Sequence, residues 1–335
     1  MGTNAVERVW VPSRFGEPSE SIAAAARRLK GVPVVDRKVI ITIAPTGGMA
    51  DKTATAHLPT QPEEIAEDVV RCWEAGASIA AIHARRPDDG ATCNPEIYAR
   101  INELVRQRCD IIINNSTGGG ISGDMISQLP DGRREISFAQ RIQGTQGGAD
   151  MCTFDPQMQC MHRGDLELLM DTSWSRCLEL ATAMKDASIK PEWEVMSLSD
   201  IQWVRELIEL GFDKPPYYIN IVLGTDKLMS GATPYSPKNL QRFVEDLPDQ
   251  SNFCVSAIGP AQLPASVHAL ILGGHARVGL EDNIYYARGR LATNVELVER
   301  MVRIIRELNL EVASPSEARE ILGLAPARAQ SPVLA

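Results

Sequence analysis

The segment from residue 273 to residue 283, GGHARVGLEDN, places one cation and two carboxylates within a few residues of each other. Arg277 lies in a short apolar run, and Glu281 and Asp282 follow it. Adjacent residues on a strand point to opposite faces, so both acids can share a site only where the strand has ended. Crowding of this kind shifts pKa values, as in active sites. A surface salt-bridge cluster is the simpler interpretation, but the flanking apolar residues and glycines favour a functional site.

The rest of the chain alternates short strand-like and longer helix-like stretches, which must position this segment. The predicted strands are β-branched runs at residues 39–44, 78–84, 111–115, 151–154, 193–196, 217–223, 253–258 and 275–278. The predicted helices lie at residues 62–75, 95–107, 166–185, 200–210, 238–246 and 261–272. Those at 62 and 95 begin with proline followed by glutamate, which is typical of a helix N-terminus.

Eight strands that alternate with helices predict an α/β fold, a (β/α)8 TIM barrel. The alternative is an open doubly wound sheet, which usually carries a GxGxxG loop after its first strand. The sequence TGGM at residues 46–49 follows the first strand and lacks that spacing, so the barrel is favoured. The predicted organisation is an N-terminal extension at residues 1–37, a catalytic barrel at 38–323 and a C-terminal tail at 324–335.

Composition limits the possible partners and location. The chain has 335 residues, 44% of them hydrophobic, which suffices for a large core. Its net charge of −9 argues against nucleic acid or an anionic membrane as a partner, because like charges repel. We find no apolar stretch long enough to span a bilayer, no signal peptide and no CxxC pair among the seven cysteines. These features predict a cytoplasmic protein with reduced thiols.

Polar residues gather at the predicted strand ends, where TIM-barrel active sites lie. In chain order they are Thr46, His83, Arg85, Ser116, Gly118, Gly119, Thr153, Asp155, Glu194, Arg277, Glu281 and Asp282. Barrel closure puts the second and eighth strands on either side of the first, so His83 and Glu281 are expected to face each other. Their nitrogen and oxygen donors suit zinc.

The chain resembles the β-keto acid cleavage enzyme family, whose named member cleaves 3-keto-5-aminohexanoate. The likeness spans about residues 38 to 323 and leaves the first 37 residues unaccounted for. The segments that carry it are IITIAPTG at 40–47, LP at 58–59 with PEEIA at 62–66, EAGA at 74–77, STGG at 116–119, MSG at 229–231, GGHARVGLEDN at 273–283 and SPSEAR at 314–319.

The resemblance implies metal-dependent C–C bond cleavage with acyl transfer, in which a β-keto acid reacts with acetyl-CoA. It implies that Asp282, oriented by Arg277, takes a proton, while Ser116 stabilises the developing oxyanion. It also makes Thr153 a substrate-contacting residue and Glu194 an acidic residue of the site.

Further expectations concern substrate binding and assembly. Backbone N–H groups at Gly118 and Gly119, together with Thr46, are expected to bind substrate. Arg85 is expected either to bind a substrate carboxylate or to form a salt bridge at the barrel rim. Barrels of this family usually form dimers or tetramers, so the resemblance also implies a homo-oligomer.

Three departures from the family pattern matter. The family has a His-x-His zinc motif after the second strand, but here Ala81 replaces the first histidine and leaves His83 and Glu281 as ligands. The site should therefore bind zinc weakly or take another divalent metal. Met49 stands where relatives often have an acid, which disfavours a cationic substrate. Pro260 stands where many relatives carry a basic residue that could hold a CoA phosphate.

Two alternatives to a family-type transferase stay open at this point. The first is a CoA-independent lyase or hydrolase that acts on a β-dicarbonyl compound. The second is a ligand-binding protein without turnover, which the full set of polar residues disfavours.

Overall fold

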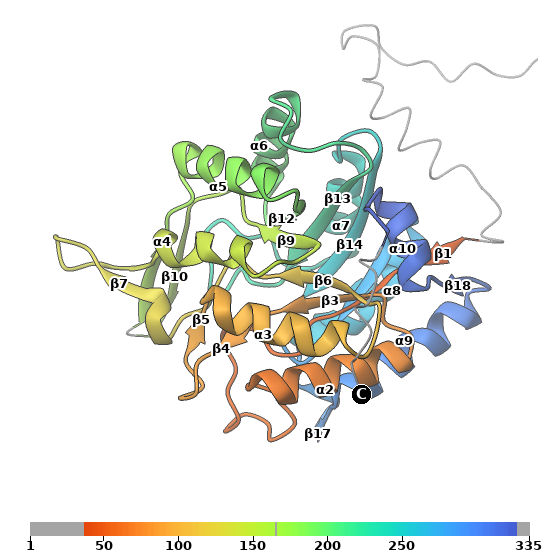
Figure 1. Cartoon of the computed structure of the whole chain (residues 1–335). Coiled ribbons are helices and arrows are strands. Elements are labelled where there is room, and N and C mark those ends of the chain that lie inside the picture. Colours follow the sequence, from red (N-terminus) through yellow and green to blue (C-terminus); the bar gives the residue numbers. More distant parts are fainter. Residues whose placement is uncertain (1–36, 165, 327–335) are drawn as a thin grey trace, which may run out of the picture.

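The computed structural model describes residues 37–164 and 166–326. Within these residues eight parallel strands close into a barrel (Figure 1), which confirms the predicted fold class. In spatial order they are β12 (Lys190–Val195), β13 (Tyr217–Leu223), β14 (Ser251–Ala257), β15 (His275–Val278), β2 (Ile41–Ile43), β3 (Ile79–Ile82), β6 (Ile112–Asn115) and β9 (Met151–Phe154). Strand β2 lies between β15 and β3, as closure of the barrel requires.

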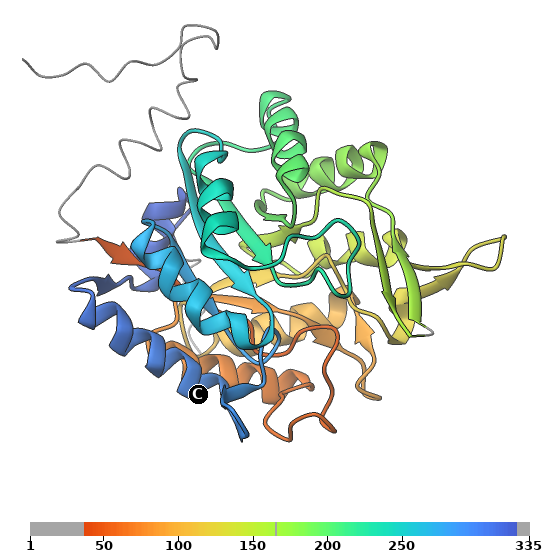
Figure 2. The same cartoon turned by 180° about the vertical axis from the view of Figure 1, so that it is seen from behind.

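Helices surround the barrel, as the views from opposite sides show (Figures 1 and 2). The main ones are α2 (Pro62–Glu74), α3 (Pro95–Arg106), α5 (Trp174–Asp186), α6 (Leu198–Glu209), α7 (Pro237–Glu245), α8 (Gln262–Ile271) and α9 (Asn294–Glu307). Between β6 and β9 the short α4 (Phe138–Arg141) continues into the 3-10 helix η2 (Ile142–Gln146). Helix α9 begins with a capping box, in which Glu296 accepts from the Thr293 N–H.

The predicted helix at 166–185 is wrong in its first part. The segment Leu166–Met170 is strand β11, which pairs antiparallel with β10 (Gln159–Arg163). Leu168 and Met170 are buried and the residue between them is not fully buried, which is a period of two. Cross-strand pairing therefore outweighs the helix propensity of this Leu-rich stretch, and α5 begins only after Ser173.

The interior of the barrel is apolar at one end. Ile79, Ile112 and Met151 open their strands and form a buried cluster with Tyr218 and Cys254. Helix α10 (Pro315–Leu322) closes this end, because its residues Ala318 and Leu322 join the same cluster. Because this apolar cluster fills the amino-terminal end of the barrel, a polar site can lie only at the opposite end, where the strands have their carboxyl ends.

The middle of the barrel is polar. Glu192 on β12 is buried and accepts a hydrogen bond from the Asn114 side-chain amide at 2.7 Å. Burial raises the pKa of Glu192 above its ordinary value. Nearer the carboxyl end, Asn220 joins β14 to β12, since it accepts from the Ser256 hydroxyl and donates to Glu194.

Accessory strands lie outside the barrel. The short pair β4 (Ala84–Arg85) and β5 (Ala91–Thr92) follows β3. A four-stranded sheet joins β10 and β11 to β8 (Arg134–Ile136) and β7 (Ile126–Gln128), and the hairpin of β16 (Tyr285–Ala287) and β17 (Arg290–Leu291) follows β15. The pair β1 (Lys38–Val39) and β18 (Glu311–Val312) brings the two ends of the described chain together.

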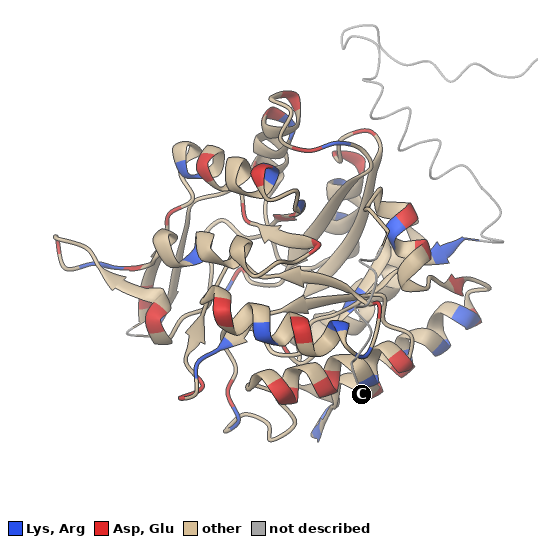
Figure 3. Ribbon diagram, in the orientation of Figure 1, with Lys and Arg blue, Asp and Glu red and all other residues tan. Residues whose placement is uncertain are grey.

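Charged residues are spread over the outer helices, where acids and bases alternate (Figure 3). Among the described residues no helix has the length and apolar character needed to cross a membrane. Residues 1–36 of the predicted N-terminal extension and most of the predicted tail lie outside the described residues.

Candidate active site

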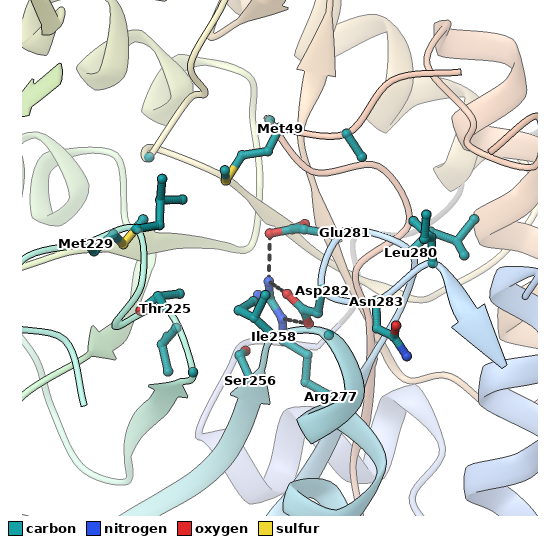
Figure 4. Close-up of a pocket in the computed structure, with 18 of the residues that line it drawn as sticks. Met49, Thr225, Met229, Ser256, Ile258, Arg277, Leu280, Glu281, Asp282 and Asn283 are labelled. Atoms are coloured by element: carbon teal, nitrogen blue, oxygen red, sulfur yellow. Dashed lines mark hydrogen bonds and ion pairs between the residues drawn. The ribbon is translucent and has the colours of Figure 1, made fainter. Parts of the chain in front are cut away.

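A cavity of about 1480 Å³ opens at the carboxyl end of the barrel strands. Its wall includes residues from several strand ends and from the loops that follow them (Figure 4). The predicted residues that line it are His83, Ser116, Gly118, Gly119, Glu194, Arg277, Glu281 and Asp282. The strand ends thus bring together side chains that lie nearly 200 residues apart in the sequence.

Arg277 on β15 is the centre of this arrangement (Figure 4). Only 4% of the residue is exposed, and its guanidinium binds both carboxylate oxygens of Asp282, each at 3.1 Å. The same group donates to Glu281 Oε1 at 2.7 Å and reaches Glu194 Oε1 at 3.5 Å. Such a bidentate contact fixes the plane of the Asp282 carboxylate.

The pKa values of the two adjacent acids, Glu281 and Asp282, are shifted in opposite directions. Burial disfavours ionisation of Glu281, but Arg277 and His83 outweigh it and lower the Glu281 pKa to about 2. For Asp282 burial is the largest influence and raises the pKa above its ordinary value, despite Arg277. Neighbouring carboxyl groups with pKa values shifted in opposite directions are typical of acid–base sites.

Backbone shape brings the loop after β15 into place. Gly279 has a φ of +148°, and a Cβ there would collide with the Ala44 carbonyl oxygen at the end of β2. The loop is also held by Gln262, which donates to the Gly279 carbonyl, and by Asn294, which accepts from the Leu280 N–H. Sequence reasoning missed Gln262 and Asn294, because their roles depend on α8 and α9 packing beside β15.

His83 follows β3 and lies opposite Glu281. Its Nε2 is 3.4 Å from Glu281 Oε1, and its Nδ1 is 2.7 Å from the Gly119 carbonyl oxygen. With Nδ1 bonded to this carbonyl, Nε2 is the nitrogen that faces Glu281, and in a neutral ring it would present its lone pair to a metal ion. Gly47, with a φ of +66°, allows this contact because a Cβ there would lie 2.6 Å from Glu281 Cγ.

Two donors fit a divalent metal ion. Besides His83 Nε2, the Glu281 Oε2 atom is buried and has no hydrogen-bond partner among the described residues. In residues 37–164 and 166–326 no group of three or more His, Cys, Asp or Glu side chains could hold a metal. An ion held by His83 and Glu281 would need substrate or solvent atoms to complete its coordination.

The loop after β6 supplies polar groups on the same wall. The Ser116 hydroxyl accepts from the Gly118 N–H at 3.1 Å, and both residues line the cavity. Thr117 fixes this loop to β9, because its N–H donates to Thr153 Oγ1 and its hydroxyl donates to the Thr153 carbonyl. Thr153 thus contacts the loop and is not among the residues that line the cavity.

Asp155, which sequence reasoning noticed at a strand end without assigning a role, lies in the cavity wall beside Glu194. The two carboxyl groups influence each other's ionisation, and Arg141 Nη2 lies 3.7 Å from Asp155 Oδ2. Burial, followed by Asp155, raises the Glu194 pKa well above its ordinary value. Burial and the neighbouring Asp155 carboxyl group thus both disfavour the ionised form of Glu194.

Two other predicted residues do not line the cavity. Arg85 is buried, and its guanidinium donates to the backbone carbonyls of Gly47, Ala50 and Asp89 at 2.7–2.9 Å. The Arg85 guanidinium therefore binds the backbone of neighbouring loops. This differs from both predictions for Arg85, a contact with a substrate carboxylate and a salt bridge at the barrel rim. Thr46 is buried next to Gly47.

Comparisons with known proteins agree with this architecture. A family model described as beta-keto acid cleavage enzyme matches residues 38–324. The 3-keto-5-aminohexanoate cleavage enzyme of Fusobacterium nucleatum is 34% identical over 86% of this chain and 98% of its own. The 3,5-dioxohexanoate:acetyl-CoA acetone transferase of Paraburkholderia graminis is 28% identical over 86% of this chain and 96% of its own. The solved ternary complex of ObcA with a C4-CoA adduct and oxalate shares the fold, with a TM-score of 0.61 and 19% identity over 80% of this chain and 68% of that one.

Proposed function

The chain belongs to the β-keto acid cleavage enzyme family, and from that premise we propose that it cleaves a β-keto acid by acyl exchange with acetyl-CoA. The observation that carries the proposal is the Asp282 carboxylate, held in both oxygens by Arg277 at the wall of the cavity and next to the Glu281–His83 pair. A base, an orienting cation and two metal-type donors are the groups that a retro-Claisen reaction needs.

The proposed reaction conserves every atom. Asp282 removes a proton from C2 of R–CO–CH2–COO⁻, and the carbanion attacks the acetyl carbonyl of acetyl-CoA and expels the CoA thiolate. The thiolate then attacks the keto carbon of the adduct, and the bond from that carbon to C2 breaks. R–CO–CoA and the acetoacetate carbanion result, and the carbanion takes its proton back from Asp282.

The local environment suits Asp282 to this role. Its raised pKa makes it a stronger base than an ordinary aspartate, while the contact with Arg277 keeps the carboxylate in one orientation. The Ser116 hydroxyl lines the cavity and accepts from the Gly118 N–H, so its own proton is free to stabilise negative charge on a substrate oxygen. On the other side of the Arg277 guanidinium, Glu194 accepts from it at 3.5 Å and so helps to orient it.

His83 and Glu281 would hold a divalent ion, zinc or another metal. When bound, such an ion would act as a Lewis acid at the substrate's keto oxygen. Glu281 keeps its charge over the whole physiological range because its pKa is about 2. The Gly119 carbonyl keeps the His83 ring in the orientation that presents Nε2.

The substrate's side group is proposed to be apolar. Met49 lines the cavity and is 48% exposed, at the position where relatives often carry an acid. Ile258 and Met229 line the same cavity (Figure 4). A cationic side group would find no acidic partner at Met49, whereas an alkyl or aryl group would be desolvated there.

The size of the cavity supports a second substrate. About 1480 Å³ exceeds the 300–1,000 Å³ typical of a pocket for one drug-sized ligand, so a small keto acid alone would leave much of it empty. The purified protein should be incubated with a panel of β-keto acids, with and without acetyl-CoA, and the products followed by mass spectrometry. Acetoacetate and a new acyl-CoA that form only with acetyl-CoA are expected. Equal cleavage without acetyl-CoA would favour the lyase or hydrolase alternative.

Homo-oligomer formation and a cytoplasmic location stay predictions from the sequence. Light scattering of the full chain after size-exclusion chromatography tests the first. Fractionation of the producing cells tests the second.

A further inference from the structure

A cluster of arginines lies on the rim of the cavity, beyond the residues assigned above. Between residues 285 and 303 the chain carries four arginines and two glutamates, within a molecule whose net charge is −9. We call Arg288, Arg290, Arg300 and Arg303 the arginine rim. Its members come from the β16–β17 hairpin and from helix α9, which follows it.

Tyr286 holds the arginine rim together. The guanidinium carbons of Arg290 and Arg300 each lie 4.3 Å from the centre of its ring. Arg300 also donates to the Tyr286 carbonyl at 2.7 Å, and Arg303 donates to the Tyr286 hydroxyl at 3.3 Å. Packing against an aromatic ring orients the guanidinium groups without neutralising them.

The positive charge of the rim is only partly balanced. Arg290 pairs with Glu296, but in the described part of the chain no carboxylate lies within 4.0 Å of a guanidinium nitrogen of Arg288, Arg300 or Arg303. Burial, and then the neighbouring Arg303 and Arg290, lower the pKa of Arg300. Like charges held near each other with few counter-charges form a site for an anion with several negative groups.

The rim is continuous with the candidate active site. One unbroken stretch of chain, from Leu280 to Gly289, lines the cavity, and Arg300 lines it as well. This stretch contains Glu281 and Asp282 at one end and Arg288 at the other. A ligand that reacts at Asp282 and carries its phosphates at a distance could therefore occupy both ends.

We propose that Arg288 and Arg300 bind the phosphate groups of acetyl-CoA, with Arg290 and Arg303 supporting them. This inference rests on the proposed use of acetyl-CoA as a substrate. Acetyl-CoA fits the chemistry, because a long uncharged arm separates its reactive thioester from a diphosphate and a 3′-phosphate. The rim would supply the positive charge that Pro260 does not supply at the position where many relatives have a basic residue.

The test compares acetyl-CoA with acetyl-pantetheine, which has the same thioester and no phosphate. The measured quantity is the ratio of kcat/KM for acetyl-CoA to kcat/KM for acetyl-pantetheine. In Arg288→Gln and in Arg300→Gln this ratio is expected to fall about tenfold each, through KM for acetyl-CoA. Arg300→Lys keeps the charge and should recover part of the loss. Arg242→Gln, on α7 away from the cavity, is the matched control and should keep the wild-type ratio.

Arg288→Gln guards against a folding artefact, because the Arg288 side chain makes no hydrogen bond or ion pair within the described residues, whereas Arg300 packs on Tyr286. A ratio that stays at the wild-type value in both variants would overturn the proposal. So would a change of oligomeric mass with no change in the ratio, which would make the rim a contact between copies of the chain.

Calorimetric titration of the same proteins with CoA separates this inference from the proposed function, because it needs no turnover. Binding by the wild type that weakens in the rim variants would support the rim even if no β-keto acid reacts. Equal binding by wild type and variants would count against the rim even if the wild type proves to be an acetyl-CoA-dependent enzyme.

Discussion

Replacement of Arg277 by methionine tests the electrostatic account of the site most directly. The guanidinium contacts Glu194, Glu281 and Asp282, and only 4% of the arginine is exposed. Removing one partner from a buried ion pair leaves an uncompensated charge and costs about 3–5 kcal/mol. A chain of this size loses about 1.4 °C in Tm for each kcal/mol, so Arg277→Met should melt about 4–7 °C lower near neutral pH.

The pH dependence of the stability lost in Arg277→Met gives a sharper test than the size of that loss. In the wild type Glu281 is ionised above pH 2, because Arg277 and His83 lower its pKa. Without Arg277 the buried Glu281 should keep a proton in the folded state, whereas in the unfolded state it ionises above about pH 4.5. The folded variant then holds one more proton than the unfolded chain, so its stability falls as pH rises, by about 1.4 kcal/mol per pH unit.

The assay is denaturant unfolding of wild type and variant at pH 5.5 and 7.5. The difference in unfolding free energy should be about 2.7 kcal/mol larger at the higher pH if one extra proton is held. Arg85→Met is the matched control, because it removes a buried arginine whose direct acceptors are backbone carbonyls that do not titrate. The reasoning is refuted if both variants show the same pH dependence, or if Arg277→Met costs less than about 1 kcal/mol at either pH.

Asp282→Asn keeps the shape of the side chain and removes the base, so kcat should fall about 10²–10⁴-fold. The circular dichroism spectrum should stay unchanged. A wild-type rate would exclude Asp282 as the base. In the wild type the raised Asp282 pKa should place the acid limb of the kcat profile above the pH of an ordinary aspartate, since the rate is lost as Asp282 gains a proton. Ala81→His should tighten zinc binding at His83 by at least tenfold in chelator competition, and an unchanged affinity would place the metal ligands elsewhere. Met49→Glu should change the ratio of kcat/KM for cationic to apolar β-keto acids by about tenfold in favour of the cationic ones. Met158 is exposed and lies outside the cavity wall, so Met158→Glu should leave this ratio unchanged. The same ratio in both variants would remove Met49 from the side-group pocket.

Much of the fold could be predicted from the sequence because its signals are local. Each barrel strand overlaps a predicted apolar run, and proline followed by glutamate marks the starts of α2 and α3. Closure of parallel strands then brings their carboxyl ends to one rim, so His83 and Glu281, 198 residues apart, meet at 3.4 Å. The strand at Leu166–Met170 was missed because its pairing with β10 is a tertiary contact.

Side-chain direction and ionisation belong to the tertiary structure alone. Arg85 and Arg277 are both arginines at strand ends, yet one binds loop carbonyls and the other binds carboxylates. Which of these happens depends on the loops that fold over each strand end. The raised pKa of Glu194 arises from burial and from Asp155, whereas the lowered pKa of Glu281 arises from Arg277 and His83, which act against burial. The sequence by itself determined which residues lie at the strand ends, and packing decided which of them line the cavity, which of them meet and how each one ionises.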